Sequence, residues 1–219
     1  MPGVGPTESE GEIEGRVKLL ADLFYPMNRE RFLKVLADRF YPILRDQGFQ
    51  GSGTTLRRVR EPVVHVFNIQ GSSSADGFYV NLGAHLVFLP KEGGGSVVPG
   101  ELKEAECAFR DRIHPSTKLG RWPYARTSTA KLMKEWERQG DAFFKKYSVF
   151  PDDFRELVEA AVVTPTDPCD GLKYARIAAQ LGLRDKAAAL AREALANVAP
   201  RATGLRADLA RFLEELGAA

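Results

Sequence analysis

The feature that most constrains this chain is a strand–turn–strand pattern between residues 63 and 88. Phe78–Phe88 alternates apolar side chains with mostly polar or small ones at every second position. Alternation over this length predicts an antiparallel strand that buries one face against a core. The apolar run Val63–Gln70 and the turn-forming segment Gly71–Gly77 precede it and complete a predicted β-hairpin. The rest of the chain must therefore supply a core for one face of this hairpin.

The alternation assigns the side chains of the second strand to two faces. The core face carries Phe78, Val80, Leu82, Ala84, Leu86 and Phe88, and the polar face carries Tyr79, Asn81, Gly83, His85 and Val87. Matching apolar residues of the first strand to this core face points His65 inward and His85 outward, where water or a partner would meet it. A one-residue slip in register would exchange the faces, and a facing histidine pair for acid–base chemistry is the less favoured alternative.

Composition places the chain among ordinary globular proteins. It has 219 residues, of which 44% are hydrophobic and 27% charged, and its formal net charge is +2. This charge argues against bulk attraction to nucleic acid or to a membrane surface, and no apolar run approaches the roughly 20 residues that span a bilayer. The segment Met1–Glu10 lacks the basic start and apolar core of a secretory signal. Cys107 and Cys169 lie far apart in sequence, so we expect a reduced, cytoplasmic setting.

Helices are predicted on both sides of the hairpin. Val17–Pro26 is nearly repeated by Leu33–Pro42, which predicts two helical pieces. The second piece should begin at an Asn28 cap, kink or restart at Pro42 and end at Gly48. The strands and helices expected further along the chain are a strand over Thr54–Arg60 after a Gly51–Gly53 loop, a strand over Glu101–Ile113, a helix over Ser128–Tyr147 and a short helix from Pro151.

Thr164–Pro168 marks the clearest boundary, because the composition after it shifts to Ala, Leu and Arg. Three helices are predicted beyond it, over Asp170–Leu181, Arg184–Val198 and Thr203–Leu216. The turn between the first two looks like that of a tetratricopeptide hairpin, although one unit does not make an array. We therefore expect an α+β protein in which a small antiparallel sheet packs with helices. The predicted domains are a disordered tail over residues 1–14, the α+β domain over 15–163 and a helical C-terminal extension over 164–219.

Candidate binding residues gather on the predicted polar face and its flanking strands. Amides and a phenol on a sheet can orient a ligand or partner, and arginines from two strands can hold an anion in a bidentate manner if they converge. The candidates are Arg57, Arg58, Asn68, Gln70, Tyr79, Asn81, His85, Arg110 and Arg112. Structural roles within the protein are favoured over ligand binding for these residues. The polar side chains would hydrogen-bond a covering loop or helix, and the arginines would form ion pairs with Glu104 or Glu106.

The sequence lacks the motifs of metal binding, phosphate binding and nucleophilic catalysis. The three histidines lack metal-ligand spacing, the glycines near position 51 lack the lysine of a phosphate loop, and Gly-x-Ser-x-Gly is absent. We expect no catalytic residues, no metal and no cofactor.

Four segments in succession resemble a known family. They are Leu44–Arg58, Val66–Ser72, Phe78–Ala84 and Glu106–Ile113. Together they are similar to the domain-of-unknown-function family numbered 4304, over about residues 29–147. The resemblance implies a bacterial, cytoplasmic α+β domain and carries over no functional residues. Small families of this kind often occur beside secreted toxins, which implies an immunity-type binding protein by association.

The leading hypothesis is a non-enzymatic protein-interaction domain, one that neutralises a toxin in its more specific form. Its expected partner is another protein. The alternative is an enzyme or small-ligand binder with an Arg/His/Asn site on the sheet face, and nucleic-acid binding ranks third. A deep pocket over Asn81 would favour the alternative, and a flat or covered surface would favour protein interaction.

Overall fold

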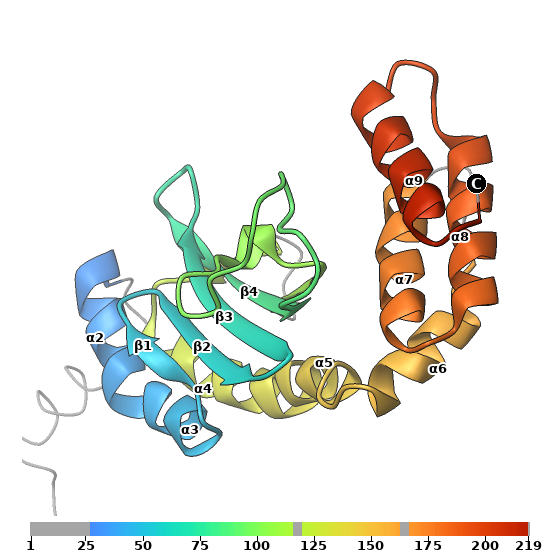
Figure 1. The fold of residues 1–219 in the computed structure, drawn as a ribbon. Helices are drawn as coiled ribbons and strands as arrows, with labels where there is room; N and C mark the ends of the chain where they lie inside the picture. Colours follow the sequence, from blue (N-terminus) through green and yellow to red (C-terminus); the bar gives the residue numbers. More distant parts are fainter. Residues whose placement is uncertain (1–26, 116–119, 163–166, 219) are drawn as a thin grey trace, which may run out of the picture. The chain divides into compact units, whose positions relative to one another are not determined.

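The computed structural model describes residues 27–115, 120–162 and 167–218. These residues form an antiparallel sheet with helices before and after it, which confirms the predicted α+β class (Figure 1). The predicted tail over residues 1–14 and the first helical piece, Val17–Pro26, lie outside the described residues. No helix of the described chain is both long enough and apolar enough to cross a membrane.

The sheet has six strands in the order β1-β2-β3-β4-β5, with β6 paired to β4. The strands are β1 (Gln50–Ser52), β2 (Thr55–Arg60), β3 (Val63–Gly71), β4 (Gly77–Leu86), β5 (Phe109–Ile113) and β6 (Trp122–Pro123). The predicted hairpin is β3 and β4. The predicted loop at Gly51–Gly53 instead contains most of β1, because β1 and β2 form a tight hairpin in which Ser52 pairs with Thr55.

The strand predicted over Glu101–Ile113 is shorter than expected. Glu104–Glu106 forms a 3₁₀ turn, and only Phe109–Ile113 joins the sheet as β5. Two hydrogen bonds fix the turn: the backbone N–H of Lys103 donates to Glu106 Oε2 at 2.8 Å, and the backbone N–H of Glu106 donates to Lys103 O at 3.0 Å. This local hydrogen bonding competes with strand pairing.

The described chain divides into two compact units. The first contains the residues up to Arg58 together with Val66–Leu82 and Asp111–Phe143. The second contains Val59–His65, Gly83–Arg110 and the chain from Phe144 onward. Strands β2 to β5 each contribute residues to both units.

Two helices precede the sheet, α2 (Arg29–Arg39) and α3 (Tyr41–Asp46). Asn28 caps α2 as predicted, with its Oδ1 accepting from the backbone N–H of Arg31 at 2.8 Å. Pro42 lies in the first turn of α3, so the helix restarts there as expected. Gly48 ends the pair in the left-handed conformation, at φ 89°.

Aromatic rings form the core of the first unit. Phe32 of α2 packs on Phe78 of β4 at a centroid distance of 4.4 Å. Phe67 of β3 lies 5.8 Å from Trp136 and 5.6 Å from Phe40. Phe78, Val80 and Leu82 are all buried, and the contact of Phe78 with Phe32 places this face of β4 against α2. Phe88, predicted on the same face, is half-buried in the turn that follows β4.

The opposite face of β4 is not the open polar surface that the alternation predicted. Asn81 is 3% exposed and His85 is 0% exposed. Gly83 explains the burial of the second half of the strand, because a Cβ built there would lie 2.6 Å from Cys107 Sγ and 3.5 Å from Glu104 Cα. The segment around the 3₁₀ turn therefore packs directly on this face. His85 is buried, so the prediction that it faces outward was wrong.

The helix predicted over Ser128–Tyr147 contains a π-helical turn. Helix α4 (Arg126–Glu135) leads into the π turn Trp136–Gly140, and α5 (Asp141–Lys146) follows. Gly140 is required there, because a Cβ would lie 2.6 Å from the Trp136 ring. Glycine is a poor helix former, but at position 140 its missing side chain leaves the space that the Trp136 indole occupies.

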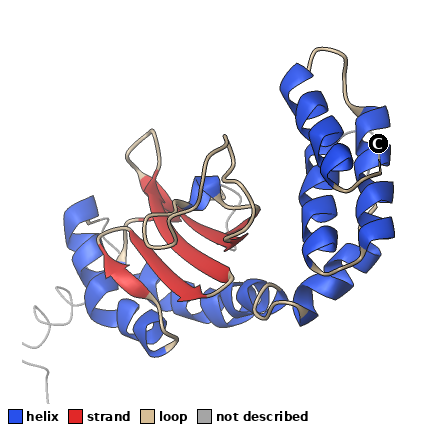
Figure 2. Ribbon diagram, in the orientation of Figure 1, coloured by secondary structure: helices blue, strands red, loops and turns tan. Residues whose placement is uncertain are grey.

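The C-terminal part of the described chain is wholly helical (Figure 2). It contains α6 (Asp152–Ala160), α7 (Pro168–Gln180), α8 (Arg184–Asn197) and α9 (Thr203–Glu215), close to the predicted ranges. Buried alanines on α7 and α8, including Ala175 and Ala191, let the two helices pack closely. Most of the predicted boundary at Thr164–Pro168 lies outside the described residues.

Candidate functional site

Five of the nine predicted site residues meet in one hydrogen-bonded cluster, which we call the Asn81 network. Its members are Asn68, Gln70, Tyr79, Asn81 and Arg112. They come from β3, β4 and β5, at alternate positions of each strand that share a face of the sheet.

Asn81 is the centre of this network. Its Nδ2 donates to Gln70 Oε1 at 2.9 Å and to Asn68 Oδ1 at 3.4 Å. Its Oδ1 accepts from Arg112 Nε at 2.9 Å. Both ends of the buried amide are thus satisfied, as a side chain only 3% exposed requires. The network is also anchored at its edge, where Asn68 Nδ2 donates to Thr55 Oγ1 at 2.9 Å.

Arg112 is held from two directions. Its guanidinium carbon lies 4.2 Å from the centroid of the Tyr79 ring, within cation–π range. Nε is engaged by Asn81, and among the described residues no acceptor is hydrogen-bonded to the two Nη atoms. Arg112 is half-buried and Gln70 is exposed. The cluster therefore presents a fixed, cationic donor edge at the surface.

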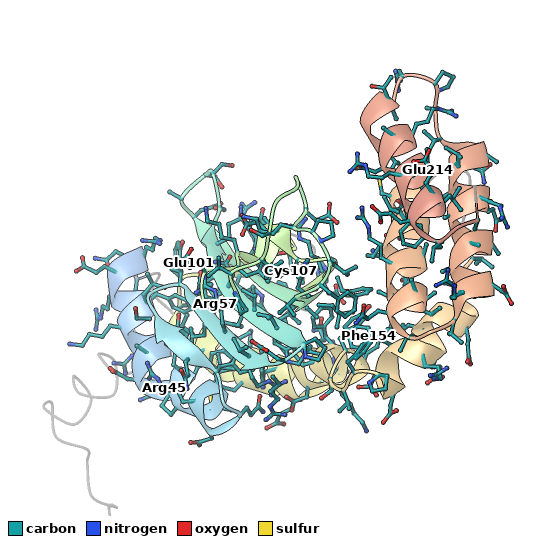
Figure 3. The ribbon with its side chains drawn as sticks, viewed as in Figure 1. Arg45, Arg57, Glu101, Cys107, Phe154 and Glu214 are labelled. Atoms are coloured by element: carbon teal, nitrogen blue, oxygen red, sulfur yellow. The ribbon has the colours of Figure 1, made fainter. Side chains whose placement is uncertain are left out.

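The other two predicted arginines of β2 do not share one arrangement. Arg58 Nη1 donates to Gln47 O at 3.1 Å, and its guanidinium lies 4.8 Å from the Phe49 ring centroid. Arg57, which is labelled in Figure 3, is half-buried and lies on β2 opposite Gln50. These contacts hold the Arg58 guanidinium beside the end of α3.

His85 and Arg110 belong to a different set of contacts, in the second unit. His85 Nδ1 accepts from the backbone N–H of Ala108 at 2.9 Å, so Nε2 carries the proton and donates to Leu89 O at 3.2 Å. Arg110 Nε pairs with Glu104 at 2.7 Å, which is the ion pair that the sequence favoured. His65 bonds Tyr147 O at 2.8 Å and lies on the Phe144 ring, so its contacts are structural.

The burial of His85 predicts a pH dependence of stability. Desolvation lowers the pKa of His85, while the Leu89 carbonyl and the charge of Glu106 act in the opposite direction. The unfolded chain therefore binds the proton more tightly, and stability is lost as the pH falls below about 6.5. We expect the free energy of unfolding in urea to fall between about pH 7.5 and 5.5, and to fall less in His85→Asn. His114→Asn, at an exposed histidine, is the control; an equal fall in wild type and His85→Asn contradicts the assignment.

Sequence reasoning missed two features of these sites. Thr55, the anchor of Asn68, precedes Arg57 by two residues and so shares its face of β2. The sequence patterns did not single out Lys173 and Arg176, although their spacing of three places them on one face of α7. Within the described chain, no group of three or more His, Cys, Asp or Glu residues could hold a metal ion.

A family model described as "Domain of unknown function (DUF4304)" matches residues 40–164 of the chain. The match confirms the family that the sequence motifs predicted, and the whole Asn81 network lies inside the matched segment. No curated protein and no solved structure matches the chain.

Proposed function

The chain belongs to the DUF4304 family, and on that premise we propose that it is a non-enzymatic protein-binding domain whose contact surface is centred on Arg112. One observation carries this proposal. The Arg112 guanidinium is fixed by Asn81 Oδ1 at 2.9 Å and by the Tyr79 ring at 4.2 Å, with its Nη edge left for an external acceptor.

Fixing this arginine before binding favours a tight contact. Ordering a long side chain at an interface costs about 0.5–1.5 kcal/mol, and here the protein's own contacts have already ordered it. Arginine and tyrosine are also the residue types enriched among those that dominate binding energy. The Nη edge matches the two oxygens of a carboxylate, so the expected contact is an Asp or Glu side chain of the partner.

The partner in this proposal is another protein that covers roughly 800 Å² of this surface. Its acidic side chain would meet Arg112, and the exposed amide of Gln70 would add a hydrogen bond at the rim. The more specific form of the proposal is an immunity-type role, in which the partner is a secreted toxin neutralised in the bacterial cytoplasm. That form rests on the family resemblance alone.

The alternative, an enzyme or small-ligand site that combines Arg, His and Asn on the sheet face, has less support. His85 would be its acid–base residue. Both ring nitrogens of His85 already bond backbone groups, at Leu89 and Ala108, and the side chain is 0% exposed. We therefore retain protein binding as the proposed function.

An affinity-capture experiment tests the proposal. The full chain, immobilised as wild type, Arg112→Ala and Arg39→Ala, is exposed to lysate of its native host, and captured proteins are identified by mass spectrometry. Arg39 is an exposed arginine of α2, so its variant controls for charge alone. We expect a protein retained by wild type and Arg39→Ala and reduced at least about tenfold by Arg112→Ala. Equal capture by all three, or no captured protein with a monomer on a sizing column, contradicts the proposal.

A further inference from the structure

A cleft lies in the second compact unit, where α7 and α9 meet the 89–95 segment. Its volume is about 380 Å³, which falls in the range of small-molecule sites. The charged residues that line it are Lys91, Glu92, Lys173, Arg176, Asp208 and Arg211. Four cations thus face two carboxylates, and the lining carries a net positive charge.

Three of the four cations are already paired within the protein. Lys173 Nζ donates to Ala108 O at 3.1 Å and also pairs with Asp170. Lys91 pairs with Glu106 at 3.3 Å. Arg211 pairs with Asp208 at 3.1 Å, and both side chains are largely exposed. These contacts fix the walls of the cleft.

Arg176 differs from the other three. It is half-buried, and among the residues that the structure describes it has no hydrogen-bond or ion-pair partner. Burial lowers its pKa, and the charge of Arg211 adds to this, while Asp208 and Glu215 act in the opposite direction. A guanidinium that has lost part of its hydration and has gained no acceptor is stabilised by a bound anion.

The rest of the lining suits a ligand with an anionic end and an apolar body. Lys173 and Arg176 project from one face of α7, because they are three residues apart. Leu172 and Leu205 give an apolar wall. Gly94 and Gly95 have φ of 91° and 92°, and their lack of a side chain leaves the backbone open to close approach by a ligand.

We propose that this cleft binds a small organic molecule that carries a phosphate or carboxylate group, with Arg176 as its principal contact. The shared chemistry is an oxyanion that accepts two hydrogen bonds from the guanidinium. Lys173 adds charge from the same helix face, and the leucine wall contacts the body of the ligand. None of the residues that line the cleft belongs to the Asn81 network. The proposed ligand site can therefore be tested independently of the proposed protein-binding surface.

Titration calorimetry on the full chain at low salt tests the site, with adenosine monophosphate and citrate as the phosphate and carboxylate probes. Adenosine controls for the anionic group. We expect one of the two anions to bind and adenosine not to bind. Arg176→Gln should weaken binding at least about tenfold, the loss of a charge-assisted hydrogen-bond pair. Arg155→Gln, at an exposed arginine of α6 that does not line the cleft, should leave affinity within about twofold.

A second variant tests the site without relying on the fold of Arg176→Gln. Asp208→Asn removes a carboxylate from the lining, so it should tighten anion binding by roughly threefold or more, since like charge near the ligand is lost. Far-UV circular dichroism checks that each variant is folded. The proposal is overturned if neither anion binds wild type at millimolar concentration, if Arg176→Gln binds as well as wild type, or if Asp208→Asn leaves affinity unchanged or weaker.

Discussion

Trp136→Ala should destabilise the protein by about 3–5 kcal/mol, the cost of removing a large aromatic side chain from a packed core. Trp136 is 1% exposed, and its ring lies 5.6, 6.1 and 5.8 Å from the centroids of Phe40, Phe49 and Phe67. The indole thus joins the π-helical turn to α2 and β3. Its removal leaves a cavity that three rings on different elements cannot all close.

The measurement is urea unfolding followed by circular dichroism at 222 nm, because the variant loses a fluorescent indole. Val98→Ala is the control, at a side chain that is 53% exposed. It should change the free energy of unfolding by less than about 0.5 kcal/mol. A loss below about 1 kcal/mol in Trp136→Ala would show that the indole is not the centre of this core.

Gly83→Val should cost roughly 3 kcal/mol, the upper part of the range for overpacking a core. A Cβ at Gly83 would lie 2.6 Å from Cys107 Sγ and 3.0 Å from Cys107 Cβ. Cys107 (Figure 3) is buried and its Sγ donates to Lys103 O at 3.4 Å, so it has little room to move. The added side chain must therefore push the segment around the 3₁₀ turn away from β4.

A paired variant separates this steric effect from strand propensity. Cys107→Ala removes the Sγ atom and should recover part of the loss in a Gly83→Val background, which a double-mutant cycle in urea measures. Gly100→Val is the matched control, because a Cβ at Gly100 meets no atom within 4 Å. If Gly83→Val unfolds at the same urea concentration as wild type, the close packing over this half of β4 is wrong.

Periodicity predicted those parts of the fold that local sequence determines. The alternation in Phe78–Leu86 placed the apolar side chains of β4 on one face, and Phe78 on that face packs against Phe32 of α2. Asn28 and Pro42 marked the limits of the first described helices by capping and by proline geometry. The alanine-rich stripes gave α7 and α8 nearly to the residue.

What periodicity could not predict was the covering of the other face. Alternation shows that Asn81 and His85 point away from the apolar core, but not whether another segment packs over them. The contact between Gly83 and Cys107 joins residues far apart in sequence, and nothing local to either predicts it. The 3₁₀ turn at Glu104–Glu106 was missed for a related reason, because its side-chain cap outweighs the alternating pattern of the surrounding residues.

The candidate site was predicted in composition better than in arrangement. Asn68, Asn81 and Arg112 were expected to be neighbours because their strand positions share one face of the sheet, and the structure hydrogen-bonds them together. The amide orientations and the stacking of Arg112 on Tyr79 depend on side-chain packing across three strands. His85 shares that face of β4 by parity, yet its hydrogen bonds with Leu89 and Ala108 remove it from the network.

The most direct test of the proposed function is the dissociation constant of the captured partner for wild type, Arg112→Ala and Arg39→Ala, measured with purified proteins. The Arg112 edge, held by Asn81 and Tyr79, predicts a loss of at least about tenfold, or roughly 1.4 kcal/mol, in Arg112→Ala alone. A dissociation constant that is the same for all three proteins contradicts the central claim that Arg112 is the binding contact.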